Sequence, residues 1–190
     1  MGIIYNIEPI RLKDYPFLDV ICESFNNLLR LLLGWNIFTP DFLPPISLCI
    51  IFWTGGAFLM TMKRYAEYKF INNKKKSINY RKSFKFYNEK SLILFANFSA
   101  IFCSIFIGIF IAKYKLELIL LTPFIAALFC YYYFLSEKKN SIAQSTEFLF
   151  KDRILVLIVI TNVILAFVLI KYELSFLQIF DYFIIKNNLF

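Results

Sequence analysis

The sequence predicts an all-α membrane protein, a polytopic transmembrane helical bundle of about five spans. Of its 190 residues, 59% are hydrophobic and 20% aromatic, and the mean hydropathy is +0.63, whereas a soluble domain is roughly half apolar. Runs with few or no charges reach the ~20 residues that a helix needs to cross a bilayer. Because lipid offers no hydrogen-bond partners, the backbone N–H and C=O groups of such runs must bond to one another, in helices or in a closed barrel. The alternating pattern of barrel strands is missing from this sequence.

The predicted elements follow in chain order. The spans are expected at residues 17–38, 46–62, 91–112, 116–135 and 154–170. The first is unusually polar, and the second follows Pro44 and Pro45 and continues beyond the membrane to residue 71. Residues 1–172 therefore form one transmembrane unit. Residues 173–190 are expected to form an amphipathic or interfacial tail, because their polar residues recur every three or four positions.

Basic residues in the connecting segments predict the orientation. Segments 2–16, 63–90 and 136–153 contain two, ten and four Lys or Arg residues. Because five spans alternate sides, these sixteen residues share one face, and the connections on the other face contain only four. The positive-inside rule places the basic face in the cytoplasm, and we expect the plasma (inner) membrane. The same rule explains the net charge of +8, so we expect no nucleic-acid partner.

Several kinds of chemistry are excluded by residue type and spacing. The chain has no histidine, and its four cysteines are widely separated, which excludes the usual thiolate and imidazole metal sites. The cysteines are expected to be small packing residues. The sequence also contains no nucleophile elbow, P-loop, dinucleotide fingerprint or HExxH motif.

The first candidate site is the element where the second span leaves the membrane. Arg64 and Glu67 are three residues apart and Lys63 and Glu67 are four apart, so the three side chains can share one helical face. The two cations could bind a phosphate or diphosphate, Arg64 as a planar fork and Lys63 as a point charge. Glu67 could hold a divalent cation. The alternative is a surface ion pair among positive-inside residues, which contributes little energy.

The second candidate is the polar side of the first span. Asp19, Glu23, Asn26, Asn27 and Arg30 recur at intervals of three or four. Ionisable groups within spans usually face a cavity or a partner. Glu23, Asn26, Asn27 and Arg30 could line a hydrophilic cavity, or these side chains could form hydrogen bonds between helices that only pack the bundle.

Two further segments lie beside the predicted membrane. Tyr80, Phe84 and Tyr87 are spaced i, i+4, i+7, which predicts an amphipathic helix lying against lipid headgroups. Asp152 is expected to cap the fifth span, and Arg153 to anchor it at the membrane edge. Composition, spacing and charge together predict a helical bundle with a polar cavity and a basic inner mouth suited to an anionic substrate.

The order of several short motifs resembles a known family. An N-terminal group comprises Tyr5 and the runs PIRLK at 9–13, PFLDV at 16–20 and LRLLLGW at 29–35. It resembles the fourth-loop and fifth-helix region of UbiA-type prenyltransferases. A second group comprises FLM at 58–60, KRYAE at 63–67, SFKFY at 83–87 and residues 147–155. It looks like the branch containing decaprenyl-phosphate phosphoribosyltransferase, in which Lys-Arg-x-x-Glu replaces the second aspartate-rich motif.

The resemblance spans about residues 5–170 and implies that the predicted spans are family helices five to nine. It implies catalytic roles for three residues, Lys63, Arg64 and Glu67, with Glu67 also a Mg²⁺ ligand. It further implies substrate-binding roles for Asn26, Asn27, Arg30, Lys13, Tyr87 and Asp152. The family's first motif, Asn-Asp-x-x-Asp, is absent from this sequence. The chain would then supply half an active site, as a truncated gene, a chain whose other half is separate, or a degenerate homologue.

The resemblance therefore implies a membrane-embedded transferase, or its C-terminal half. It would move a prenyl or phosphoribosyl group between a polyprenyl lipid and a diphosphate-bearing partner, with Mg²⁺ as cofactor and membrane lipid around it. The alternative is a non-catalytic membrane protein, such as an accessory subunit, a small transporter component or a degenerate homologue.

Overall fold

The computed structural model describes residues 5–7, 11–71, 79–138, 141–144 and 146–172. Helices dominate this part of the chain, and no strand occurs in it. The long helices are α2 (Leu18–Phe38), α3 (Ile46–Ile71), α5 (Glu89–Tyr114), α6 (Thr122–Glu137) and α7 (Arg153–Lys171). The predicted all-α bundle is confirmed. The interfacial tail predicted at 173–190 lies outside the described residues.

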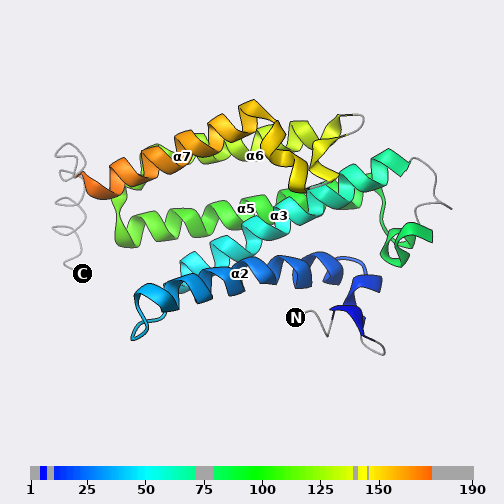
Figure 1. Ribbon diagram of the computed structural model, residues 1–190, viewed down its shortest axis with the longest axis horizontal. Coiled ribbons are helices and arrows are strands. Elements are labelled where there is room, and N and C mark those ends of the chain that lie inside the picture. The colour runs from blue at the N-terminus through cyan, green and yellow to red at the C-terminus, as the bar shows by residue number, and fades with distance from the viewer. Residues whose placement is uncertain (1–4, 8–10, 72–78, 139–140, 145, 173–190) are drawn as a thin grey trace, which may run out of the picture.

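Four of the described helical segments are long and apolar enough to cross a membrane. They are α3, α5, α7 and the segment Leu116–Glu137, in which the 3₁₀ helix η3 (Leu116–Leu121) leads directly into α6. The first predicted span forms as α2 with the expected bounds, but it is not among these four. Asp19, Glu23 and Arg30 lower the hydropathy of α2, so this helix is not apolar on all sides. It lies beside α3 (Figure 1).

The helices run side by side along the long axis of the molecule (Figure 1). α3 packs most extensively against α5 and α2, and α6 packs against α7. The α2–α3 and α5–η3 connections lie at one end of the bundle. The N-terminal segment and the 3₁₀ helices η2 (Lys82–Lys85), η4 (Ile142–Gln144) and η5 (Thr146–Lys151) lie at the other. The three basic segments thus meet at one end, hereafter the basic end.

The main hydrophobic core lies toward the basic end, between α3, η2, α5 and α6. Phe84 and Tyr87 are fully buried in it. The ring of Phe84 lies edge-on to Tyr68 with centroids 5.8 Å apart, and that of Tyr87 edge-on to Phe17 at 5.2 Å. The amphipathic helix predicted at 80–87 is therefore wrong. The segment instead forms the 3₁₀ helix η2 at Lys82–Lys85, and the Phe84 and Tyr87 rings pack inside the bundle.

Side-chain caps fix where two of the helices begin. Asn88 and Ser91 form a reciprocal capping box at the start of α5. At α7, the Leu155 amide donates to Asp152 Oδ1 at 2.9 Å, which confirms the predicted N-cap. This backbone hydrogen bond, helped by a bond from the Tyr131 hydroxyl at 3.0 Å, lowers the pKa of Asp152.

Candidate functional site

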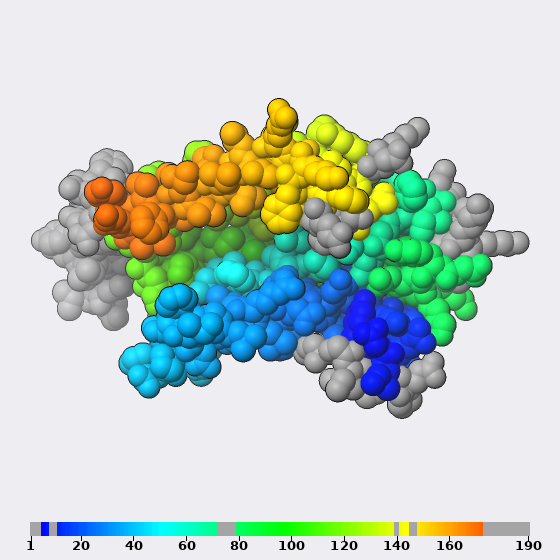
Figure 2. All heavy atoms as spheres, viewed as in Figure 1, coloured from blue at the N-terminus to red at the C-terminus, as the bar shows by residue number. Residues whose placement is uncertain are grey.

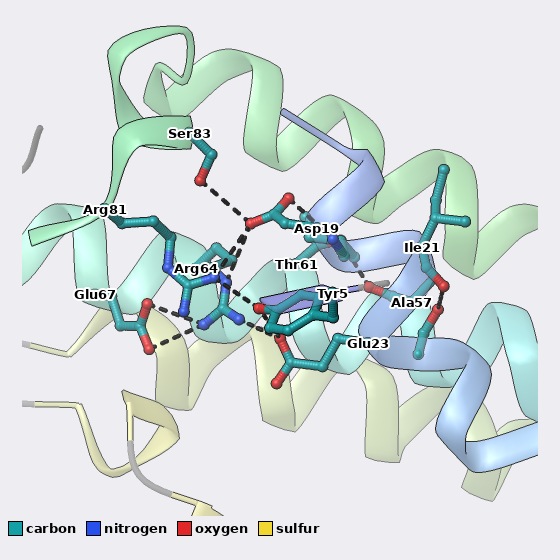
Figure 3. Close-up of polar contacts among 12 residues, drawn as sticks. Tyr5, Asp19, Ile21, Glu23, Ala57, Thr61, Arg64, Glu67, Arg81 and Ser83 are labelled. Carbon is teal, nitrogen blue, oxygen red and sulfur yellow. Dashed lines mark hydrogen bonds and ion pairs between the residues drawn. The ribbon is translucent and has the colours of Figure 1, made fainter. Parts of the chain in front are cut away.

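Arg64 is the centre of a buried group of charges at the basic end (Figure 3). It lies on α3, and its side chain is 1% exposed. Its Nη1 donates to both carboxylate oxygens of Glu67 at 3.1 Å, one turn further along α3. Its Nη2 donates to Glu23 of α2, and its Nε lies 3.5 Å from Asp19 Oδ2. One guanidinium is thus surrounded by three carboxylates from two helices.

A second arginine approaches the same carboxylates from the segment before η2. Arg81 Nη1 lies 3.5 Å from Asp19 Oδ2 and donates to the Tyr5 hydroxyl at 3.1 Å. That hydroxyl donates to Glu23 at 3.4 Å. Burial raises the pKa of Tyr5, and the charge of Arg81 partly offsets the rise. We call Asp19, Glu23, Arg64, Glu67 and Arg81 the ionic cluster; with all five ionised, it carries one net negative charge.

Asp19 connects the ionic cluster to the core. Its Oδ1 accepts a 2.5 Å hydrogen bond from the Tyr87 hydroxyl, and its Oδ2 accepts one from Ser83 at 3.4 Å. The Tyr87 oxygen in turn accepts the Phe17 amide at 2.6 Å. Phe17 has a φ of 63°, a left-handed conformation that is costly for a bulky residue. The Tyr87 hydroxyl thus stabilises the strained backbone of Phe17, the residue just before α2.

Burial and the negative charge of Asp19 raise the pKa of Tyr87. The phenol therefore stays protonated and keeps donating to Asp19. Removing ions from water costs several kcal/mol per ion, which a buried cluster offsets only when its members are well paired and hydrogen-bonded. In the cluster, Arg64 pairs with all three carboxylates and Arg81 pairs with Asp19, and these contacts join α2, α3 and the η2 segment.

The structure brings together only some of the residues that the sequence singled out. Arg64, Glu67 and Tyr87 belong to or contact the ionic cluster. Lys63 is half-buried and forms no ion pair within the described part of the chain. Lys13 donates to Asn6 Oδ1 at 3.0 Å, and Asp152 caps α7 near the same end.

The polar side of α2 divides into three environments. Asp19 and Glu23 join the ionic cluster, and Asn27 lies so close to Gly56 of α3 that a Cβ on Gly56 would collide with the Asn27 amide. Asn26 and Arg30 are exposed. Of the four residues expected to line a cavity, Arg30 lines an open groove between α2 and α3, whereas Glu23 is part of the ionic cluster.

Three participants were not singled out as site residues by the sequence: Tyr5, Arg81 and Ser83. Arg81 was one of ten basic residues in its segment, and its spacing gave no sign that it would reach α2. Tyr5 appeared only within a motif of the resemblance. Their contacts join residues at least 18 positions apart, which periodicity within one helix does not reveal.

The carboxylates of the ionic cluster differ from the ligand set of a Mg²⁺ site. Mg²⁺ is usually held by one or two carboxylates together with substrate phosphates and water. Both oxygens of Glu67 accept from Arg64, and the guanidinium lies where a cation would bridge the carboxylates. No group of three or more His, Cys, Asp or Glu side chains is arranged to hold a metal ion among the described residues. The described side chains alone therefore do not fit a Mg²⁺ site.

The fold and the site define a class: an all-α bundle in which four of the described helical segments are long and apolar enough to cross a membrane, and in which a buried ionic cluster joins α2, α3 and the η2 segment at the basic end. Neither a protein-family model, nor a curated protein, nor a solved structure matches the chain.

Proposed function

We propose that the chain is a membrane-embedded transferase of the UbiA superfamily, or the C-terminal half of one. It moves a prenyl or phosphoribosyl group between a polyprenyl lipid and a diphosphate-bearing partner. The supporting observation is the position of Lys63, Arg64 and Glu67 on α3, at the end of the bundle where the basic segments meet. An anionic headgroup would bind there, while the polyprenyl chain lies along the apolar helices.

The transfer requires that negative charge be stabilised as it develops. The carbon that bears the diphosphate forms a bond to the acceptor while its C–O bond breaks, and the diphosphate leaves with the electron pair. Cations beside the leaving group stabilise this charge. Lys63 is the candidate for direct contact, because its ammonium forms no ion pair among the described residues. Arg64, already bound by three carboxylates, is assigned to positioning α3 and Glu67.

The predicted Mg²⁺ requires carboxylates from outside the described residues. A separate chain that supplies four spans and an Asn-Asp-x-x-Asp loop would provide them, together with the missing half of the active site. In this arrangement the basic end lies on the cytoplasmic side of the plasma membrane, and Lys13, Asn26 and Asn27 keep their predicted roles toward substrate.

The test is a transfer assay on membranes that contain the chain together with the product of an upstream reading frame encoding such a half. Radiolabel should pass from phosphoribosyl diphosphate into extracted lipid, or from a polyprenyl diphosphate into a polar acceptor. Lys63→Ala should lower turnover at least tenfold, whereas Lys113→Ala, an exposed lysine at the opposite end, should leave it unchanged. Arg64→Ala should abolish transfer. Unchanged turnover in Lys63→Ala and Arg64→Ala would overturn the proposal.

A second candidate function is a non-catalytic membrane protein, such as an accessory subunit, a small transporter component or a degenerate homologue. The burial of Arg64 and its pairing with Asp19, Glu23 and Glu67 favour it, since this arrangement joins helices and keeps the Arg64 guanidinium away from a substrate anion. This alternative predicts a stable chain without any partner half, and no transfer of either group in the assay above.

A further inference from the structure

A second feature lies along α2, away from the ionic cluster. An open groove of about 530 Å³ runs between α2 and α3. Arg30, Gly34 and Trp35 of α2 and Phe52 of α3 line it. Arg30 lies seven residues after Glu23, which is about 10 Å further along the helix. In Figure 2, α2 forms one long edge of the molecule, so this side of the bundle is open to a neighbour.

The position of Phe52 along α3 shows how deep in the membrane the groove lies. The apolar part of α3 extends from Ile46 to Met62, where Lys63 and Arg64 follow. Phe52 is six residues from one end of this stretch and ten from the other, about 9 Å and about 15 Å at 1.5 Å per residue. Since Arg30 borders the same groove, its charge lies at the depth of hydrocarbon and not at a headgroup.

Arg30 has no ion-pair or hydrogen-bond partner among the described residues, and its side chain is exposed. A side chain on an α-helix leans toward the helix N-terminus, which for Arg30 is the direction away from the nearer membrane face. Eight residues, about 12 Å, separate it from the end of α2 at Phe38. A charged arginine in such a position is costly unless it pairs with another group.

We propose that this face of α2 is a docking site for a transmembrane helix of another chain, and that this helix carries a carboxylate at the depth of Arg30. The planar guanidinium and a carboxylate form two parallel hydrogen bonds, which are strongest away from water. Gly34, one turn after Arg30, leaves open space around its Cα, so that a second backbone can approach closely. The rings of Trp35 and Phe52 supply apolar contact.

A second copy of this chain fits the site poorly. Within the described residues, Asp19, Glu23 and Glu67 belong to the ionic cluster at the basic end, and no exposed carboxylate lies at the depth of Arg30. A two-fold interface on this face would place Arg30 opposite Arg30. The phosphate of a lipid lies at the membrane face, about 12 Å of helix away. The inference does not rest on the proposed transferase activity.

The test uses the full chain in its native membrane, with a photo-crosslinking phenylalanine analogue in place of Leu33. Leu33 is 68% exposed and lies one turn from Arg30. The matched control places the analogue at Val163 of α7, which is 63% exposed. We expect irradiation to give an adduct with one membrane protein from position 33 only. The adduct should fall at least tenfold in Arg30→Ala and Arg30→Glu and be kept in Arg30→Lys.

Charge exchange identifies the contact. The peptide joined to position 33 should lie in a spanning helix with an Asp or Glu, and reversing that carboxylate to Arg should restore the adduct lost in Arg30→Glu. An adduct that is unchanged in Arg30→Ala would overturn the proposal. So would an adduct to a second copy of this chain, to its own residues 173–190, or to lipid alone. Unaltered size-exclusion profiles of the Arg30 variants will show that they fold.

Discussion

Arg64 of α3 and Glu23 of α2, 41 residues apart in the sequence, form an ion pair that joins the two helices. The Tyr5 hydroxyl donates to the same carboxylate. α2 carries the ionisable residues Asp19, Glu23 and Arg30, and ionisable groups beside a membrane need partners within the bundle. The ionic cluster supplies a directional attachment at the basic end, and this attachment makes specific predictions.

The first prediction concerns the central guanidinium. Arg64→Ala leaves three carboxylates close together and partly buried, so the free energy of unfolding should fall by about 3–5 kcal/mol, as when one partner of a buried ion pair is removed. Reversible SDS denaturation in mixed micelles measures this change. Arg153→Ala, in which an exposed arginine at the same end is removed, should change it by less than about 0.5 kcal/mol. Equal stability of the two variants would show that the ionic cluster does not hold α2.

The second prediction concerns the hydroxyl of Tyr87. Tyr87→Phe removes the group that donates to Asp19 and accepts the Phe17 amide, leaving two buried polar groups without this partner. The free energy of unfolding should fall by about 1–3 kcal/mol. Tyr80→Phe, at a mostly exposed tyrosine of the same segment, is the matched control and should be neutral. Identical denaturation midpoints for both variants would contradict the assigned role.

The third prediction concerns the close approach of α2 and α3. A Cβ at Gly56 would displace the Asn27 amide, whereas a Cβ at Gly55 would meet only Cys103 Sγ at an ordinary 3.5 Å. Both alanine substitutions gain the same helix propensity. Gly56→Ala should therefore be less stable than Gly55→Ala by about 1 kcal/mol, the lower part of the range for overpacking, because an amide can move. The double variant Gly56→Ala with Asn27→Ala should recover most of this loss.

The fourth prediction concerns the start of α7. Asp152→Ala removes the N-cap and should lower the free energy of unfolding by about 1 kcal/mol, while Asp152→Asn should keep most of it. Because the folded-state pKa of Asp152 is lowered, its contribution is present above the unfolded pKa of about 4 and is lost as the pH falls through the folded value. Wild-type and Asp152→Ala proteins should thus converge in stability below about pH 4, as denaturation at graded pH will show. A difference that persists at low pH would exclude the capping carboxylate as its source.

The sequence by itself determined the class of the fold. Length and hydropathy predicted five spans; four of them form helical segments long and apolar enough to cross a membrane, and the first forms as α2 with the expected bounds but falls short of that apolarity. It also determined the Asp152 cap, since a cap is a contact between residues three positions apart. The Lys63–Arg64–Glu67 element was recognised for the same reason, because i,i+3 and i,i+4 neighbours can be identified without the tertiary structure.

Only the tertiary structure decided what these residues contact. The Lys63–Arg64–Glu67 spacing was compatible with an arginine that binds substrate and with one that joins helices. In the structure, Arg64 forms ion pairs with Asp19 and Glu23 of α2. Tyr80, Phe84 and Tyr87 had helical spacing, yet two of the three rings are buried in the core. In both cases the partners come from other helices. Spacing along one helix shows which side chains share a face, whereas the packing of a second helix against that face decides whether a charge is paired there or, as at Arg30, left open to a partner.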